Sequence, residues 1–175
     1  MGGFTPRPDA SAIAGFLKLL FGDKAPGLFA IWTKGDKLTK WFPATEITAA
    51  AQYMAACAVM DDCYFGVGLQ KKDLGARSRG TANTVIGIAG VWLDLDVAGR
   101  AHAQKKLPSS TEDALSFLQE LPHPPTIVIS SGHGLQVWWL FEDPWIFAND
   151  EDRQAAQKLV TEWQKEINRA AADKG

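Results

Sequence analysis

Two aspartates that are two positions apart end an apolar segment in the middle of the chain. They are Asp94 and Asp96, in the stretch Val85–Asp96 that reads VIGIAGVWLDLD. Side chains two apart on a β-strand project to the same face, so this spacing places the two carboxylates side by side. Neighbouring anions repel unless a cation neutralises them, and Mg²⁺ and Mn²⁺ prefer oxygen ligands of this kind. The pattern therefore indicates either a divalent-metal site or a solvated strand end.

A turn that contains glycine is the second candidate for chemistry, in the segment SSGHGLQ that begins at Ser130. Small residues leave backbone N–H groups accessible, and with a hydroxyl and an imidazole they form a group that can hold phosphate oxygens. An ordinary hairpin turn with an isolated histidine is the alternative. The other histidines lie in a basic loop (His102) and in the Pro-rich stretch LPHPP (His123). The residues of the candidate phosphate site are Ser131, Gly132, His133 and Gln136.

Basic residues and one tryptophan are further candidates for binding a nucleic acid. The loops that flank the Asp94 strand contain Lys71, Lys72, Arg77, Arg79, Arg100, Lys105 and Lys106. Charged loops are usually just solvated, but positive loops on both sides of a carboxylate pair also suit a cradle for the phosphates of a nucleic acid. Trp138 precedes Trp139 on a predicted strand, so it shares a face with Gln136. Its ring either stacks on a base or sugar, or is covered by a helix.

Hydrophobic patterns predict the elements that must position these residues. The β-branched run Val85–Asp96 is typical of a central strand, whose end is a common place for ligands. The segments TIVIS and LQVWWLF, on either side of the glycine turn, predict a hairpin. Helices are predicted over Ile13–Phe21, over Thr45–Met60, after a capping pattern at Ser109 and Ser110, and from Asn149 onward, with further β-structure over Gly27–Thr33 and Tyr64–Leu69.

Composition limits the class of protein. The chain has 175 residues, 46% of them hydrophobic, and a formal net charge of −2, which predicts one globular domain and excludes a mainly disordered chain. Binding to a polyanion must therefore come from a local basic patch. Two cysteines cannot form a disulfide framework or a thiolate zinc site, which fits a reducing cytoplasm. The apolar stretch near the start is short and interrupted by Lys18, so no membrane association is expected.

An ordered set of short motifs resembles the N-terminal catalytic domain of bifunctional DNA primase-polymerases. The set is YFGVGL, RG, GVWLDLD, LPSS before a capped helix, and SGHGLQVWWLFEDPW. That family belongs to the archaeo-eukaryotic primase superfamily, in its plasmid, phage and prophage replication branch. The resemblance covers most of the chain, and its specificity lies in the order of the motifs. It implies an α/β (α+β) fold, with an RRM-like catalytic sheet packed with helices and a small N-terminal α/β unit.

The resemblance also implies roles for the two candidate sites. The first family motif, an acid pair on a strand, matches Asp94 and Asp96, which would hold Mg²⁺ or Mn²⁺. The second motif in many relatives reads S-G-x-G-hydrophobic-H, and here the position of its phosphate-contacting histidine is occupied by Gln136. Either Gln136 donates its amide to a phosphate, or His133 takes over, and the prediction favours His133 as the charged partner.

One family motif is expected beyond this sequence. The third metal-binding acid and its arginine- and Pro-Gly-Thr-containing stretch should follow the last helix, where the sequence ends at Gly175. The expectation is therefore a single catalytic domain over residues 1–175, truncated before that motif. Clamping of two metal ions usually draws on more than one strand, so full activity is expected of the complete protein.

The predicted function is template-directed, metal-dependent nucleotidyl transfer by a DNA primase and DNA polymerase. The implied partners are a dNTP or NTP, a DNA template and primer, and a helicase or replication domain on the C-terminal side. The basic loop residues Lys71, Lys72, Arg77 and Arg79, with Trp138, would bind nucleic acid. Two alternatives remain: a metal-dependent nuclease or phosphatase that uses the same acid pair, and a catalytically silent module that binds single-stranded nucleic acid.

Overall fold

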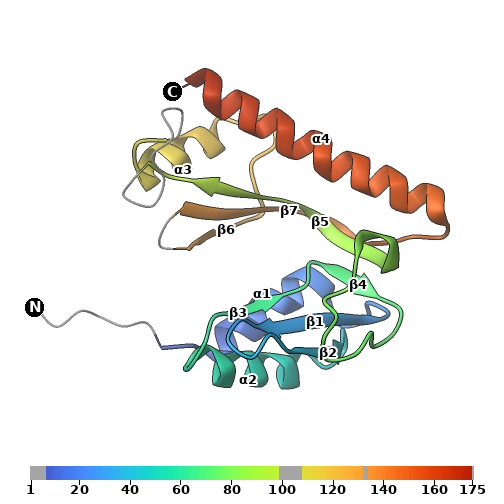
Figure 1. The fold of residues 1–175 in the computed structure, drawn as a ribbon. Coiled ribbons are helices and arrows are strands. Elements are labelled where there is room, and N and C mark those ends of the chain that lie inside the picture. The colour runs from blue at the N-terminus through green and yellow to red at the C-terminus, as the bar shows by residue number, and fades with distance from the viewer. Residues whose placement is uncertain (1–6, 99–107, 132–133, 175) are drawn as a thin grey trace, which may run out of the picture. The chain divides into compact units, whose positions relative to one another are not determined.

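The structure, a computed structural model, describes residues 7–98, 108–131 and 134–174 (Figure 1). Within these ranges it contains four α-helices, one short 3₁₀ turn and a seven-stranded antiparallel sheet. The mixed α/β fold expected from the sequence is therefore confirmed. In chain order the elements are α1 (Ala10–Phe21), β1 (Leu28–Thr33), β2 (Thr39–Pro43), α2 (Ile47–Ala58), β3 (Cys63–Phe65), β4 (Gly68–Gln70), η1 (Ala82–Thr84), β5 (Val85–Asp96), α3 (Thr111–Gln119), β6 (Ile127–Ser130), β7 (Gly134–Ile146) and α4 (Asp150–Lys174).

The chain divides into two compact units. Unit 1 comprises Met1–Ala89 and Asp143–Asn149, and unit 2 comprises Gly90–Glu142 and Asp150–Gly175. The strands run in the order β2-β1-β4-β5-β7-β6, and β3 also pairs with β1. Strands β5 and β7 each contribute residues to both units. The expected single catalytic domain over residues 1–175 stays a prediction.

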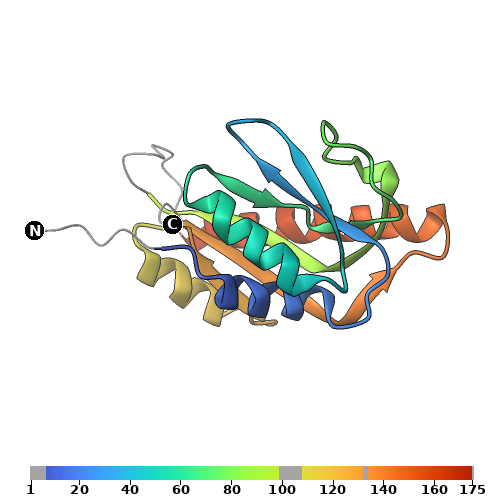
Figure 2. The same cartoon turned by 90° about the horizontal axis from the view of Figure 1, so that it is seen from below.

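Unit 1 buries one face of its strands under two helices. Figures 1 and 2 show α1 and α2 side by side on this face. Alternation along β1 sends Phe29 and Ile31, both 0% exposed, toward the helices, where Phe29 stacks on Phe21 of α1 with ring centroids 4.9 Å apart. Ala30 and Trp32 therefore lie on the opposite face, across from Trp41 and Thr39 of β2. That second face is the floor of the cavity described below.

Unit 2 has its own hydrophobic core. Figure 1 shows α3 and α4 on the same side of β5, β6 and β7. The buried residues of this core are Val91, Leu93, Leu95, Ala114, Phe117, Leu118, Leu135, Val137, Trp139 and Ile167. Because these strand residues alternate with the others, the intervening residues of β5 and β7 share the face that turns away from α3 and α4. This arrangement places the candidate carboxylates away from the core.

Most predicted elements appear at the expected positions. The strand Val85–Asp96 has the predicted bounds, and Ser110 caps α3 by accepting a hydrogen bond from the backbone N–H of Asp113 at 3.0 Å. The β-rich segment Tyr64–Leu69 forms two short strands, because β3 pairs with β1 whereas β4 pairs mainly with β5. In the described part of the chain no helix is both long and apolar enough to cross a bilayer.

Candidate functional site

The two aspartates lie on one face of β5, as the sequence predicts. Asp94 and Asp96 are exposed, while their neighbours Leu93 and Leu95 are 4% and 3% exposed in the core of unit 2. The burial therefore alternates with the period of a strand, and both carboxylates point away from α3 and α4. Trp92 precedes them on the same face, and its backbone carbonyl accepts a hydrogen bond from Gln164 Nε2 of α4 at 2.9 Å.

Gly134, which ends the glycine turn, lies against the end of the same strand. A Cβ added to Gly134, the first residue of β7, would lie 2.4 Å from the carbonyl oxygen of Leu95 and 3.1 Å from the Cα of Asp96. Real Cβ contacts are not that short, so glycine is required for this approach of the two backbones. The structure thus brings the aspartate pair and Gly134, at the end of the predicted phosphate turn, together within unit 2.

The residues of that turn have different positions in the structure. Ser131 is exposed, and its backbone N–H and its Oγ both donate to the carbonyl oxygen of Gly134, at 3.0 and 3.1 Å. The Ser131 hydroxyl hydrogen is therefore already engaged by the Gly134 carbonyl in this structure. Gln136 pairs with Ile129 of β6 and alternates with the buried Leu135 and Val137, so it lies on the face that carries the aspartates. Gly132 and His133 lie outside the described residues.

Two tryptophans share this face. The rings of Trp92 and Trp138 stack with centroids 5.9 Å apart and an interplanar angle of 30°. Trp138 shares the face of Gln136, as predicted, but it is only 4% exposed. Trp138 is thus covered in this structure, but on the face that turns away from α3 and α4, so the expected coverage by a helix stays a prediction. Trp138 therefore offers little ring surface to a nucleic acid here.

The predicted basic loop lies in unit 1. Lys71, Lys72, Arg77 and Arg79 are all exposed, in the segment between β4 and η1. Of these side chains, Arg79 has a defined partner, because its guanidinium carbon lies 4.7 Å from the centre of the Trp32 ring. The second basic loop, with Arg100, Lys105 and Lys106, lies outside the described residues, as does His102.

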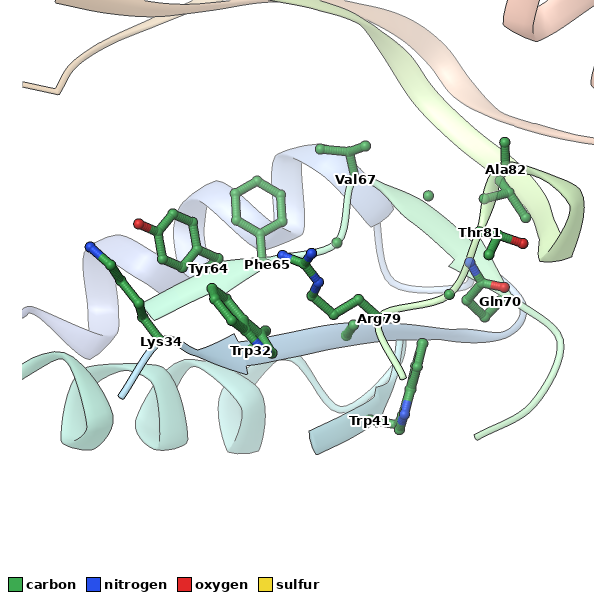
Figure 3. Close-up of a pocket in the computed structure, with 15 residues that line it drawn as sticks. Trp32, Lys34, Trp41, Tyr64, Phe65, Val67, Gln70, Arg79, Thr81 and Ala82 are labelled. Atoms are coloured by element: carbon green, nitrogen blue, oxygen red, sulfur yellow. The ribbon is translucent and has the colours of Figure 1, made fainter. Parts of the chain in front are cut away.

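Arg79 belongs to a cavity that the sequence does not predict. This cavity has a volume of about 700 Å³ and lies wholly in unit 1, on the sheet face opposite α1 and α2 (Figure 3). Four aromatic residues line it, Trp32, Trp41, Tyr64 and Phe65, although the ring of Phe65 packs edge-on against Phe16 of α1. They come from three different strands, β1, β2 and β3, which are paired in the sheet. The volume is in the range of small-molecule and nucleotide sites.

The charged groups at this cavity are positive. Among the described residues that line it, Lys34 and Arg79 carry charge and none is an Asp or Glu. Lys34 Nζ donates to the carboxylate of Asp62 at 2.8 Å, and this hydrogen bond and the attraction of the two charges raise the pKa of Lys34 above its ordinary value. Arg79 has no carboxylate partner among the described residues. Figure 3 shows its side chain lying over Trp32 in the middle of the cavity.

One buried amide faces the same space. Gln70 is 4% exposed, lines the cavity, and its Oε1 has no hydrogen-bond partner among the described residues. Its amide lies at the end of the cavity where Thr81 and Ala82 also lie (Figure 3). Gly80 approaches Gln70 so closely that an added Cβ would lie 2.7 Å from Nε2, and Gly80 has a φ of +77°. A buried acceptor without a partner costs free energy, so Gln70 has an unmet requirement for a donor.

The aspartate pair fits a hard divalent cation in the chemistry of its donors. Mg²⁺ is usually held by one or two carboxylates together with the phosphates of a substrate, and two exposed carboxylates on one strand face offer that set. Within the described ranges no group of three or more His, Cys, Asp or Glu side chains forms a larger metal-binding cluster. The arrangement is therefore suited to a metal that is shared with a phosphorylated substrate.

No relative identifies the chain. It matches no family model, no curated protein and no solved structure.

Proposed function

We propose that the chain is a nucleotidyl-transfer domain of the primase-polymerase type, with its catalytic carboxylates in unit 2. One observation carries the proposal, which is the approach of Gly134 to Asp96. It brings an exposed acid pair next to a glycine turn, and the sequence patterns of a metal site and a phosphate site thereby become neighbours. The order of the short motifs that resemble the primase-polymerase family supports the same function.

Each described residue of the site would have a separate task. Asp94 and Asp96 would hold Mg²⁺ or Mn²⁺, and the bound metal would neutralise charge on the triphosphate and favour attack by a 3′-hydroxyl. Gln136 shares their face, and its amide N–H groups can donate to a phosphate oxygen. Backbone N–H groups of the glycine turn would add further donors, with His133 as the favoured charged partner.

The direct test removes both carboxylates. In the double variant Asp94→Ala/Asp96→Ala we expect template-directed incorporation of labelled dNTPs with Mn²⁺ to fall more than about a hundredfold, because even residues that only orient metal ligands contribute 10- to 100-fold. Both residues are exposed, so the melting temperature should stay close to that of the wild type.

A matched control removes two exposed carboxylates from β7. The variant Glu142→Ala/Asp143→Ala makes the same change in charge, and it should keep incorporation at the wild-type level. Binding of Mn²⁺ alone, followed by electron paramagnetic resonance, gives a second measurement that does not depend on turnover. The wild type and the control should bind Mn²⁺, whereas the Asp94/Asp96 variant should not.

The same assays separate the alternatives. Release of nucleotides without a template would favour the metal-dependent nuclease or phosphatase. Binding of single-stranded DNA with neither Mn²⁺ binding nor incorporation would favour a silent binding module. Incorporation that survives in the Asp94/Asp96 variant would refute the proposed role of the pair.

A further inference from the structure

The cavity of unit 1 is separate from the carboxylate site in both residues and chemistry. Its lining comes from β1 to β4, the turn after β1, the loop before β5 and Val85 at the start of β5, and it includes neither aspartate nor any residue of the glycine turn. It combines flat aromatic rings, a guanidinium over one of them, and a buried amide with an open acceptor. These are the groups that proteins use to hold an unpaired nucleobase.

The electrostatics favour an anionic ligand over a cationic one. An aromatic cage for an ammonium group would need an open ring face, but the face of Trp32 is already covered by the Arg79 guanidinium at 4.7 Å. A guanidinium held in this way keeps its second face and its N–H edge for a ligand. It can stack on a base and donate to a neighbouring phosphate.

The loop that supplies Arg79 favours a strand over a single nucleotide. Gly80 and Thr81 of this loop also line the cavity, and Lys71, Lys72 and Arg77 are exposed on the same segment between β4 and η1. Charges placed along one loop match the repeated phosphates of a polynucleotide. A duplex fits poorly, because its bases are stacked and paired and cannot enter a cavity.

We propose that this cavity binds an unpaired base of single-stranded nucleic acid, stacked on the Trp32 and Arg79 pair, with the Gln70 amide hydrogen-bonded to the edge of the base. The proposal rests on the proposed function for the choice of nucleic acid as the ligand. It extends that function by adding a strand-binding site in unit 1 that requires no metal. Every base carries an N–H group that can donate a hydrogen bond to Gln70 Oε1, so the site needs no particular sequence.

The test measures binding by fluorescence anisotropy with the full chain. The probe is a fluorescein-labelled oligothymidylate of about 20 nucleotides, without metal, and the comparison probe is an abasic strand of the same length. In the variant Trp32→Leu we expect binding of oligothymidylate to weaken about tenfold, since stacking of one base contributes roughly that much. The wild type should bind the abasic strand more weakly than oligothymidylate.

Two further variants separate recognition from a structural role. Gln70→Met keeps the length of the side chain and removes the unpartnered oxygen, so it should weaken oligothymidylate binding while the melting temperature stays equal or rises. Arg79→Gln should weaken binding of both probes and lower the salt dependence by about one phosphate contact. Lys24→Gln is the matched control, because Lys24 is exposed in unit 1 and does not line the cavity.

Specific outcomes would overturn the proposal. They are equal affinity of the wild type for the abasic strand and oligothymidylate, or unchanged oligothymidylate binding in both Trp32→Leu and Gln70→Met. Failure of this inference can be distinguished from failure of the proposed function, because the two are tested with different variants and different ligands. The Asp94→Ala/Asp96→Ala variant should bind oligothymidylate like the wild type, and the cavity variants should bind Mn²⁺ like the wild type.

Discussion

The carboxylate face of unit 2 and the cavity of unit 1 are built in opposite ways. The carboxylate face is formed by alternate residues of one strand and by a backbone contact at Gly134, where no side chain fits. The cavity is formed by large side chains that come from separate strands and one loop. A site of the first kind depends on the path of the backbone, whereas a site of the second kind depends on which side chains meet.

This difference determines what a mutation does to each region. At the carboxylate face, one added methyl group in the backbone contact should lower stability more than the loss of an exposed carboxylate does. In the cavity, the loss of one side chain should weaken binding without disturbing the fold. The two regions should therefore be separable by mutation.

The strongest test of the backbone contact is Gly134→Ala. The added Cβ would lie 2.4 Å from the Leu95 carbonyl oxygen, so we expect a loss of about 1–3 kcal/mol in the free energy of unfolding and weaker Mn²⁺ binding. Binding of oligothymidylate should be preserved. Urea unfolding measures the first effect, and paramagnetic resonance the second.

Gly15→Ala is the control for Gly134→Ala. Gly15 lies inside α1 and an added Cβ there meets nothing within 4 Å, so this variant should be more stable by about 0.5–1 kcal/mol. A Gly134→Ala protein that is as stable as the wild type and binds Mn²⁺ equally well would contradict the described contact between β5 and β7.

A smaller effect is expected at Gly80, in the loop that supplies Arg79. Gly80→Ala places a left-handed conformation on alanine and a methyl group 2.7 Å from Gln70 Nε2. We expect a loss of about 1–2 kcal/mol in stability, together with weaker binding of oligothymidylate and normal binding of Mn²⁺. Calorimetry measures the loss of stability, anisotropy measures oligothymidylate binding, and paramagnetic resonance measures Mn²⁺ binding.

Gly75→Ala controls for the conformational part of that change. Gly75 has a φ of +88° in the same loop, but an added Cβ there meets nothing within 4 Å. Both variants should lose similar stability, and only Gly80→Ala should lose affinity. Equal affinities in the two variants would mean that the Gln70 amide takes no part in binding.

The smallest effect concerns acid stability, and it compares one carboxylate in each unit. A hydrogen bond from the Thr33 hydroxyl lowers the pKa of Asp36 in unit 1, and hydrogen bonds from Ser109, chiefly, and Ser110 lower the pKa of Asp113 in unit 2. A carboxylate whose pKa is lowered by folding stabilises the native state above its unfolded pKa. This contribution is lost as the pH falls below 3.8 and through the lower native pKa.

Thr33→Val and Ser109→Ala remove the respective donors. Melting temperatures measured from about pH 7 down to about pH 2.5 should therefore fall less steeply below pH 3.8 in each variant than in the wild type. A wild-type slope in both variants would exclude these hydrogen bonds as the cause. A change in only one variant would show that only the hydrogen bond removed in that variant contributes to acid stability.

The carboxylate face could be predicted from the sequence because it depends on local periodicity. The positions of Asp94 and Asp96 follow from alternation along one strand, and the same rule gives the face of Gln136. The capped helix α3 was predicted equally well from Ser110. Short-range rules of this kind need no knowledge of which strands pair.

The cavity could not be predicted from the sequence, because it depends on the pairing of strands that are far apart in the chain. Trp32 and Trp41 meet only when β1 pairs with β2, and Tyr64 joins them only through β3. Alternation predicts that Ala30 and Trp32 share a face, but not what covers that face. The predicted stacking role of Trp138 depended on the same kind of information, because the pattern gave its face but not its burial.

The route of the polypeptide between the two units limits how the gene can be dissected. Unit 1 ends its first run at Ala89 but is completed by Asp143–Asn149, where the amide of Phe147 donates to the carbonyl of Ile86 at 2.8 Å. A truncation after Ala89 would delete that returning segment and leave this edge of β5 unpaired. Separate production of either half therefore calls for engineered linkers, one that joins Ala89 to Asp143 and another that joins Glu142 to Asp150.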